Sequence, residues 1–138
     1  MKTQMINIKT IDSRYAGKLS FFEGTHDVPF EIKRIYYIHG VPNASHRGGH
    51  AHIALQQILF CPYGKIEILL DDGYEKVSVV LDDPGRGLLI GPGLWRNMIW
   101  HQENSVLCVA ASEYYDEKDY IRDYDVFLHY VKEGRTHG

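Results

Sequence analysis

Cysteine is scarce in this sequence, and long apolar runs are absent from it. The two cysteines, Cys61 and Cys108, each lie within an apolar, strand-like segment, and we interpret them as small core residues rather than as a disulfide or a nucleophile. No apolar run approaches the length that spans a membrane, and the start, "MKTQMINIKTIDSR", lacks the apolar core of a secretory signal. We therefore expect a soluble, cytoplasmic protein with no membrane attachment.

An excess of charge of one sign is also absent. The chain has 15 basic and 18 acidic residues, a formal net charge of -3, and its basic residues are scattered rather than gathered into a stripe. This composition gives no reason to expect nucleic-acid binding. An anionic small molecule is compatible with it, because a site needs only one or two well-placed arginines.

Internal repeats and low-complexity tracts are absent as well, and the length predicts a single domain over residues 1–138. Short runs of β-branched, aromatic and aliphatic residues alternate with turn-forming pairs such as Tyr63-Gly64 and Asp83-Pro84. Strands this short and closely spaced favour an antiparallel sandwich or barrel, an all-β fold. The predicted strands cover residues 5–10, 18–24, 30–40, 48–54, 56–64, 65–73, 75–83, 87–93, 95–102 and 105–113.

The last part of the chain shows a different periodicity. Apolar and aromatic residues there recur at helical spacing, which predicts one amphipathic helix that closes off the β-structure. Asp116 and Asp119 are both candidates for its N-terminal cap. The residues of the stripe are Tyr120, Ile121, Tyr124, Phe127, Leu128 and Val131.

The segment "HRGGHAH", residues 46–52, is a candidate site for proton-transfer chemistry. Residues at i and i+2 of a strand share one face, so the imidazoles of His50 and His52 are expected to point into the same space. Two neutral imidazoles suit the removal and return of protons near pH 7, and Arg47 beside them indicates an anionic ligand. The alternative is that both histidines are hydrogen-bonded wall residues of an empty barrel.

A second strand, "PFEIKRIYYIHG", offers further candidates. Arg34 and Tyr36 alternate to one face, and Ile35 and Tyr37 to the other. An arginine or tyrosine on the concave face could orient an imidazole or bind a phosphate. Periodicity does not say which face is concave, and Arg34 in a surface ion pair with both tyrosines in the core is the alternative.

His50 and His52, followed by Gln57 and Gly64, resemble the first motif of the cupins, in which two histidines and a glutamate precede a glycine. In many cupins these side chains bind a metal together with a later histidine. Here the glutamate is replaced by Gln57, and Arg96 stands in the later region, where a cation would repel a metal. We expect no metal and take Gln57 and Arg96 as candidate substrate-binding residues; a metal-dependent cupin is the alternative.

Four segments together resemble a narrower group. They are "VPFEIKRIYYI", "RGGHAHIALQQILFCPYGKIEILLDDG", "GLLIGPGLWRNM" and "VLCVAASEYYDEKDYIRDYDVF", and they run from Val28 to Phe127. This combination is similar to the nucleotide-sugar 3,4-ketoisomerases, small metal-independent cupins that act on dTDP-4-dehydro-6-deoxyglucose. The resemblance implies a cupin jelly-roll barrel with a C-terminal helix, and a homodimer that exchanges N-terminal strands.

The resemblance also implies roles for individual residues. The reaction moves the ketone from C-4 to C-3 through an enediol and needs no cofactor. His50 would remove the proton at C-3, and His52 would shuttle protons, with Tyr37 orienting it. Arg47 and Arg34 would bind substrate, and we expect Arg34 at the diphosphate.

Two departures from the family bear on the product. Arg96 stands where many relatives have histidine, and Ala16 stands where relatives often have arginine. On this ground we favour the gluco over the galacto product, in the biosynthesis of 3-amino-3,6-dideoxy sugars of surface glycans or natural products. The alternatives are a dTDP-ketosugar 3,5-epimerase-like cupin and a non-catalytic sugar-nucleotide-binding cupin, although no effector module such as a helix-turn-helix is attached.

Overall fold

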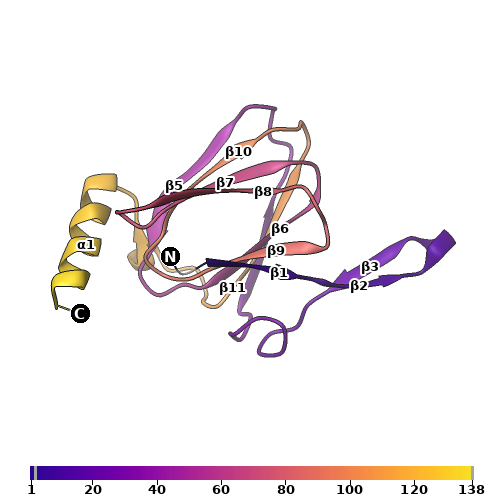
Figure 1. The fold of residues 1–138 in the computed structure, drawn as a ribbon, viewed down its shortest axis with the longest axis horizontal. Helices are drawn as coiled ribbons and strands as arrows, with labels where there is room; N and C mark the ends of the chain where they lie inside the picture. The colour runs from indigo at the N-terminus through magenta and orange to yellow at the C-terminus, as the bar shows by residue number, and fades with distance from the viewer. Residues whose placement is uncertain (2, 138) are drawn as a thin grey trace.

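The computed structural model describes Met1 and residues 3–137, with side chains to residue 134. In these residues twelve strands form two five-stranded sheets and a separate hairpin (Figure 1). The first sheet has the order β1 (Thr3–Asn7), β9 (Arg86–Ile90), β6 (Gln57–Tyr63), β11 (Val106–Ala111) and β4 (Arg34–Ile38). The second has the order β12 (Tyr120–Ile121), β5 (His46–His52), β10 (Trp95–Trp100), β7 (Ile66–Asp71) and β8 (Lys76–Leu81).

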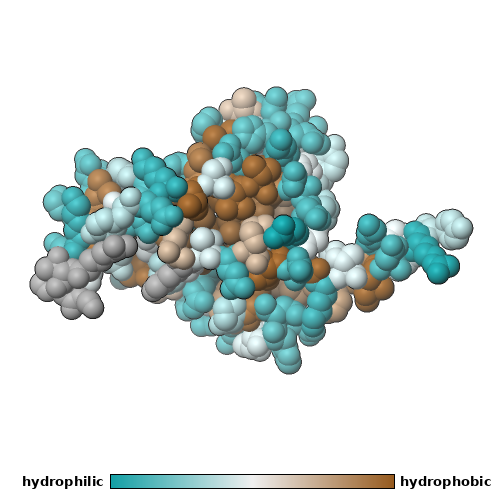
Figure 2. All heavy atoms as spheres, viewed as in Figure 1, coloured by the Kyte–Doolittle hydropathy of each residue, from teal (hydrophilic) through white to brown (hydrophobic). Residues whose placement is uncertain are grey.

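The two sheets pack face to face because most of their strands alternate apolar and polar residues. In β7, for example, Ile66, Ile68 and Leu70 are buried and face the other sheet, where Leu59 and Leu107 belong to the same core cluster. Figure 2 shows apolar residues gathered between the upper and lower sheets. Apolar burial between the sheets therefore holds the sandwich together.

From β4 to β11 the chain passes repeatedly from one sheet to the other, which is the jelly-roll pattern. The predicted all-β jelly roll with a C-terminal helix is confirmed. The two sheets do not close into the predicted barrel. Among the described residues no backbone hydrogen bonds between strands join one sheet to the other, so they form an open sandwich.

The N-terminal region differs from the prediction of one strand over residues 5–10. The chain bends at the buried Ile8, and β1 pairs with β9, whereas β2 (Lys9–Asp12) pairs with β3 (Lys18–Phe21). The resulting β2–β3 hairpin projects away from the sandwich (Figure 1). Ile11 and Leu19 on this hairpin are 54% and 56% exposed.

The C-terminal helix begins later than the apolar stripe predicted. Tyr120 and Ile121 form strand β12, which pairs with β5, and the helix α1 covers Tyr124–His137. Asp123 is the cap, since its carboxylate accepts a hydrogen bond from the Val126 amide at 3.1 Å. Asp116 and Asp119, the predicted caps, therefore have other roles. Among the described residues, the helical segments are all too short and too polar to cross a membrane.

Candidate active site

The strand β5 carries a bulge that decides which side chains reach the site. In its pairing with β10, His50 lies opposite Arg96 and Arg47 lies opposite Met98, so one extra residue is inserted in β5. Gly48 and Gly49 both have positive φ there, +99° and +75°, which glycine adopts without steric cost. Because the bulge shifts the alternation by one, Arg47, His50 and His52 share one face of β5.

This face borders a cavity of about 290 Å³ between the two sheets. The cavity opens at the edge where β4 of the first sheet lies opposite β5, β10 and β12 of the second. Its wall combines cationic, aromatic and imidazole side chains, which suits an anionic ligand with a polar ring. The lining residues are Arg34, Tyr36, Ile38, Arg47, Gly48, His50, Met98, Tyr120 and Arg122.

His52 is buried, with 1% of its surface exposed. Its Nδ1 lies 3.0 Å from the Asp119 carboxylate, and its Nε2 has no hydrogen-bond partner among the described residues. Burial and the nearby guanidinium of Arg96 lower the pKa of His52 from 6.5 to about 2, so the ring is neutral at pH 7. A neutral ring that donates from Nδ1 to a carboxylate leaves Nε2 as a bare acceptor.

His50 lies beside His52, with ring centroids 5.1 Å apart. Burial, followed by the charges of Arg96 and Arg122, lowers the pKa of His50 from 6.5 to about 4. The imidazole is therefore unprotonated at neutral pH. A base must be unprotonated to accept a proton from carbon, so His50 is in the correct state for that step.

Three side chains from different strands form a hydrogen-bonded chain behind the histidines. Arg96, which is 0% exposed, donates from Nη1 to the Gln57 carbonyl and from Nη2 to the Leu94 carbonyl at 3.0 Å. The Gln57 amide in turn donates to the Tyr36 hydroxyl at 3.1 Å. Since that hydroxyl oxygen accepts from Gln57, its own proton can be donated into the cavity.

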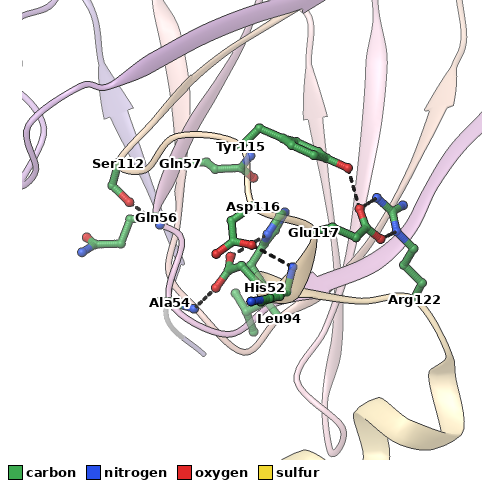
Figure 3. Close-up of polar contacts among 12 residues, drawn as sticks. His52, Ala54, Gln56, Gln57, Leu94, Ser112, Tyr115, Asp116, Glu117 and Arg122 are labelled. Atoms are coloured by element: carbon green, nitrogen blue, oxygen red, sulfur yellow. Dashed lines mark hydrogen bonds and ion pairs between the residues drawn. The ribbon is translucent and has the colours of Figure 1, made fainter.

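Three arginines lie at the cavity, and one of them is held in place by an ion pair. Arg122 donates to both oxygens of Glu117, at 2.6 and 2.9 Å, and its guanidinium stacks on Tyr120 at 4.2 Å. Figure 3 shows the Tyr115 hydroxyl and Arg122 converging on Glu117. Arg34 lies over the ring of Tyr36, and Arg47 is exposed on β5. Planar guanidinium groups arranged in this way suit a phosphate.

The structure brings together most of the residues named from the sequence. His50, His52, Arg34, Arg47, Arg96 and Gln57 all line the cavity or adjoin it. Tyr37 does not: it lies on the outer face of β4, is 64% exposed and stacks against His39. The placement of Tyr37 does not support the prediction that it orients His52, since the tyrosine on the inner face of β4 is Tyr36.

Sequence reasoning missed three residues of the site. Tyr120 lies against both imidazoles, with ring centroids 5.2 Å from His50 and 4.4 Å from His52. Asp119 contacts His52, and Arg122 lines the cavity. All three belong to the segment before α1, where the sequence signal was the unusual "YYDEKDYIRDYD" stretch, which periodicity assigned partly to the helix.

The site lacks part of the ligand set of the metal-binding cupins that the sequence resembles. This chain has Gln57 and Arg96 at the two positions where such cupins place a carboxylate and a further histidine. The Arg96 guanidinium donates a hydrogen bond to the Gln57 side-chain carbonyl. The buried guanidinium would repel a divalent cation. Among the described residues no three histidine, cysteine, aspartate or glutamate side chains converge for metal binding. These residues do not fit a metal.

The fold and site together define a class: a small jelly-roll protein with paired neutral imidazoles beside an arginine-lined cavity. Comparison with known proteins narrows that class. Residues 1–132 match the family model "FdtA: WxcM-like, C-terminal". A TDP-4-oxo-6-deoxy-alpha-D-glucose-3,4-oxoisomerase of Aneurinibacillus thermoaerophilus is 44% identical over 132 residues, covering 95% of this chain and 94% of the relative. The chain belongs to the FdtA (WxcM-like, C-terminal) family.

Solved structures agree with this family. A sugar 3,4-ketoisomerase of Thermoanaerobacterium thermosaccharolyticum, crystallised with TDP, is 44% identical, with a TM-score of 0.91 over 95% of both chains. A variant of that ketoisomerase with one histidine changed to asparagine was crystallised with TDP-4-keto-6-deoxyglucose. A dTDP-4-dehydrorhamnose 3,5-epimerase of Bacillus anthracis is 14% identical, with a TM-score of 0.75 over 86% of this chain and 77% of the epimerase, and shares the fold alone.

Proposed function

We propose that this protein is a 3,4-ketoisomerase that converts TDP-4-keto-6-deoxyglucose into the 3-keto isomer. The observation that carries the proposal is the pair of unprotonated imidazoles, His50 and His52, at an arginine-lined cavity. Relatives that are 44% identical over nearly the whole chain carry this activity in their names. The reaction is an isomerisation, so it requires proton transfers and no external oxidant or reductant.

The proton transfers at C-3 and at the two oxygens have candidate groups. His50 accepts the proton from C-3, and the electron pair of that C–H bond forms an enediolate whose negative charge lies on the C-4 oxygen. The proton of the C-3 hydroxyl then passes to the C-4 oxygen. C-4 takes up a proton from solvent as the C-3 oxygen becomes the ketone, and His50 releases its proton to solvent. His52 moves protons between the two oxygens through its bare Nε2, and the Tyr36 hydroxyl, oriented by Gln57, donates a hydrogen bond to the developing oxyanion.

The arginines account for recognition of the nucleotide diphosphate. Arg34, Arg47 and Arg122 border the same cavity as His50. A diphosphate carries about two negative charges in this environment, and guanidinium groups bind such oxygens with paired hydrogen bonds. We assign the diphosphate to Arg34 and Arg47, with Arg34 as the residue expected from the sequence, and the sugar to the histidine side. Arg122 already donates to both oxygens of Glu117.

The finer features of the function are part of the same proposal. We favour the gluco configuration at C-4 of the product, because Arg96 stands where many relatives have histidine, a side chain able to donate a proton near C-4. The product would then feed a 3-amino-3,6-dideoxy sugar pathway. The protein would act as a cytoplasmic homodimer with exchanged N-terminal strands and without a metal or cofactor.

Two alternatives differ in what they predict. A 3,5-epimerase shares the fold, and it would exchange the protons at C-3 and C-5 while leaving the ketone at C-4. A non-catalytic binding protein would bind the TDP-sugar and leave it unchanged. The neutral state of both imidazoles favours an enzyme over a binding protein, since simple binding needs no base.

Replacing His50, the proposed catalytic base, tests the proposal directly. We expect His50→Asn to lower kcat by about 10²- to 10⁴-fold, the usual contribution of a positioned base, while TDP affinity stays within about twofold. The matched control is His46→Asn, an exposed histidine on the same strand, which should leave both quantities unchanged. Steady-state kinetics and titration calorimetry measure them. Near-normal turnover by the His50 variant would contradict the proposal.

A further inference from the structure

Asp119 lies beside the site in the short 3-10 helix Glu117–Asp119, and both of its carboxylate oxygens have partners. Oδ2 lies 3.0 Å from Nδ1 of His52, and Oδ1 accepts a hydrogen bond from the Ala54 amide at 2.7 Å. The backbone is fixed as well, since the Ile53 amide donates to the Asp119 carbonyl at 3.0 Å. These contacts with residues 52–54 fix the position of the carboxylate.

We infer that Asp119 is a positioning residue that holds His52 in the Nδ1–H tautomer, with Nε2 kept bare for the substrate. This inference rests on the proposed function and adds a residue to it. A carboxylate only accepts hydrogen bonds, so the proton on a neutral His52 must lie on Nδ1. The remaining nitrogen is buried and has no partner among the described residues, as an acceptor reserved for a ligand hydroxyl would be.

The position of the His52 ring agrees with that role. Its ring centroid lies 4.4 Å from that of Tyr120 and 5.1 Å from that of His50, both of which line the cavity. A group that moves a proton between two sugar oxygens must accept from one hydroxyl and donate to the other. The Nδ1–H tautomer can begin this cycle at Nε2, whereas the opposite tautomer would present a proton to a hydroxyl that must itself lose one.

The alternative is that Asp119 only supports the backbone through Ala54. Asp119→Asn separates the two roles, because the asparagine carbonyl can still accept from the Ala54 amide. Its NH₂ group would then face Nδ1 of His52 and donate to it, which places the ring proton on Nε2. A tautomer change of this kind is costly in other His–Asp pairs.

We expect Asp119→Asn to lower kcat by about 10²- to 10⁴-fold, with KM and TDP affinity within about twofold. The spectroscopic readout is ¹⁵N–¹H NMR of the imidazoles, in which a bare ring nitrogen resonates far from a protonated one. The unaltered protein should show His52 bare at Nε2, and the variant should show it bare at Nδ1. His52→Asn identifies the His52 signals.

Asp116→Asn is the matched control. Asp116 lies just before the same 3-10 helix and accepts from the Lys118 amide at 3.0 Å without touching His52. Its variant should keep both kcat and the tautomer. Three results would overturn the inference: an Nε2–H tautomer in the unaltered protein, a fully active Asp119→Asn, or equal loss in both variants. If the unaltered protein does not isomerise TDP-4-keto-6-deoxyglucose at all, the proposed function fails, while the tautomer measurement still decides the role of Asp119.

Discussion

At the scale of single residues, the site contains the buried polar atoms that the fold leaves without partners. Among the described residues these side-chain atoms are Arg34 Nε, His52 Nε2 and Arg96 Nε, and all three lie at the cavity or directly behind it. Each buried unpaired group costs about 1–3 kcal/mol. A polar ligand that hydrogen-bonds to them recovers part of that cost. The unpaired atoms therefore lie in the part of the protein where we propose that the substrate binds.

The lowered pKa of His50 makes stability depend on pH. Its folded-state pKa is about 4 and its ordinary value 6.5, so between these values the unfolded chain binds a proton that the folded protein does not. The free energy of unfolding is then highest above pH 6.5 and decreases as the pH falls toward 4. Urea unfolding at a series of pH values measures the slope.

We expect His50→Gln to reduce that slope between pH 6.5 and 4, because the titrating group is removed. His46→Gln, on the exposed part of the same strand, is the control and should retain the slope of the unaltered protein. Identical slopes for the unaltered protein and the His50 variant would show that His50 is not buried as a neutral imidazole.

At the scale of elements, the bulge in β5 brings Arg47 to the same face as the two histidines. We expect Gly48→Ala to destabilise the protein, because φ is +99° and a Cβ would lie 2.8 Å from the Arg96 carbonyl oxygen. The left-handed conformation costs about 1–2 kcal/mol, and the overlap adds about 1–3 kcal/mol. Urea unfolding measures the loss, and TDP affinity should fall because the Arg47 side chain moves.

Gly40→Ala is the control for the effect of backbone conformation alone. Gly40 also has positive φ, +70°, but a Cβ there would meet no atom within 4 Å. Its variant should lose only about 1–2 kcal/mol and keep its affinity for TDP. Equal losses in the two variants would mean that the close approach of β5 to β10 is not what requires glycine at position 48.

The sequence was sufficient to predict which side chains share a face of a strand, because that depends only on local periodicity. The i, i+2 spacing correctly placed His50 and His52 on one face, and alternation separated Tyr36 from Tyr37. It could not decide which of those tyrosines faces inward, because that depends on where β4 lies in the sheet. Choosing the tyrosine by family resemblance alone led to the wrong side of the strand.

Long-range pairing explains what the sequence did not reveal. Asp119 is 67 residues from His52 in the chain, and only the pairing of β12 with β5 brings them together. The same pairing takes Tyr120 and Ile121 out of the helix that their spacing predicted. The helix cap was also hard to predict, since Asp116 and Asp119 precede the apolar stripe, whereas the actual cap, Asp123, lies within it.

At the scale of the whole molecule, the projecting β2–β3 hairpin exposes apolar side chains that a second copy could cover. We expect the protein to sediment as a dimer at micromolar concentration, and the double substitution Ile11→Asp and Leu19→Asp to convert it to a monomer. Val80→Asp, at an exposed position on β8 (43%), is the control and should remain dimeric. A monomeric unaltered protein would contradict the proposed strand exchange.

The most direct test of the central claim is NMR of TDP-4-keto-6-deoxyglucose incubated with this protein in D₂O. We predict a 3-keto sugar with deuterium at C-4, and the ring coupling constants would show whether C-4 is gluco, as favoured, or galacto. Unchanged substrate would contradict the ketoisomerase assignment. Deuterium at C-3 and C-5 with the ketone still at C-4 would contradict it as well and indicate an epimerase.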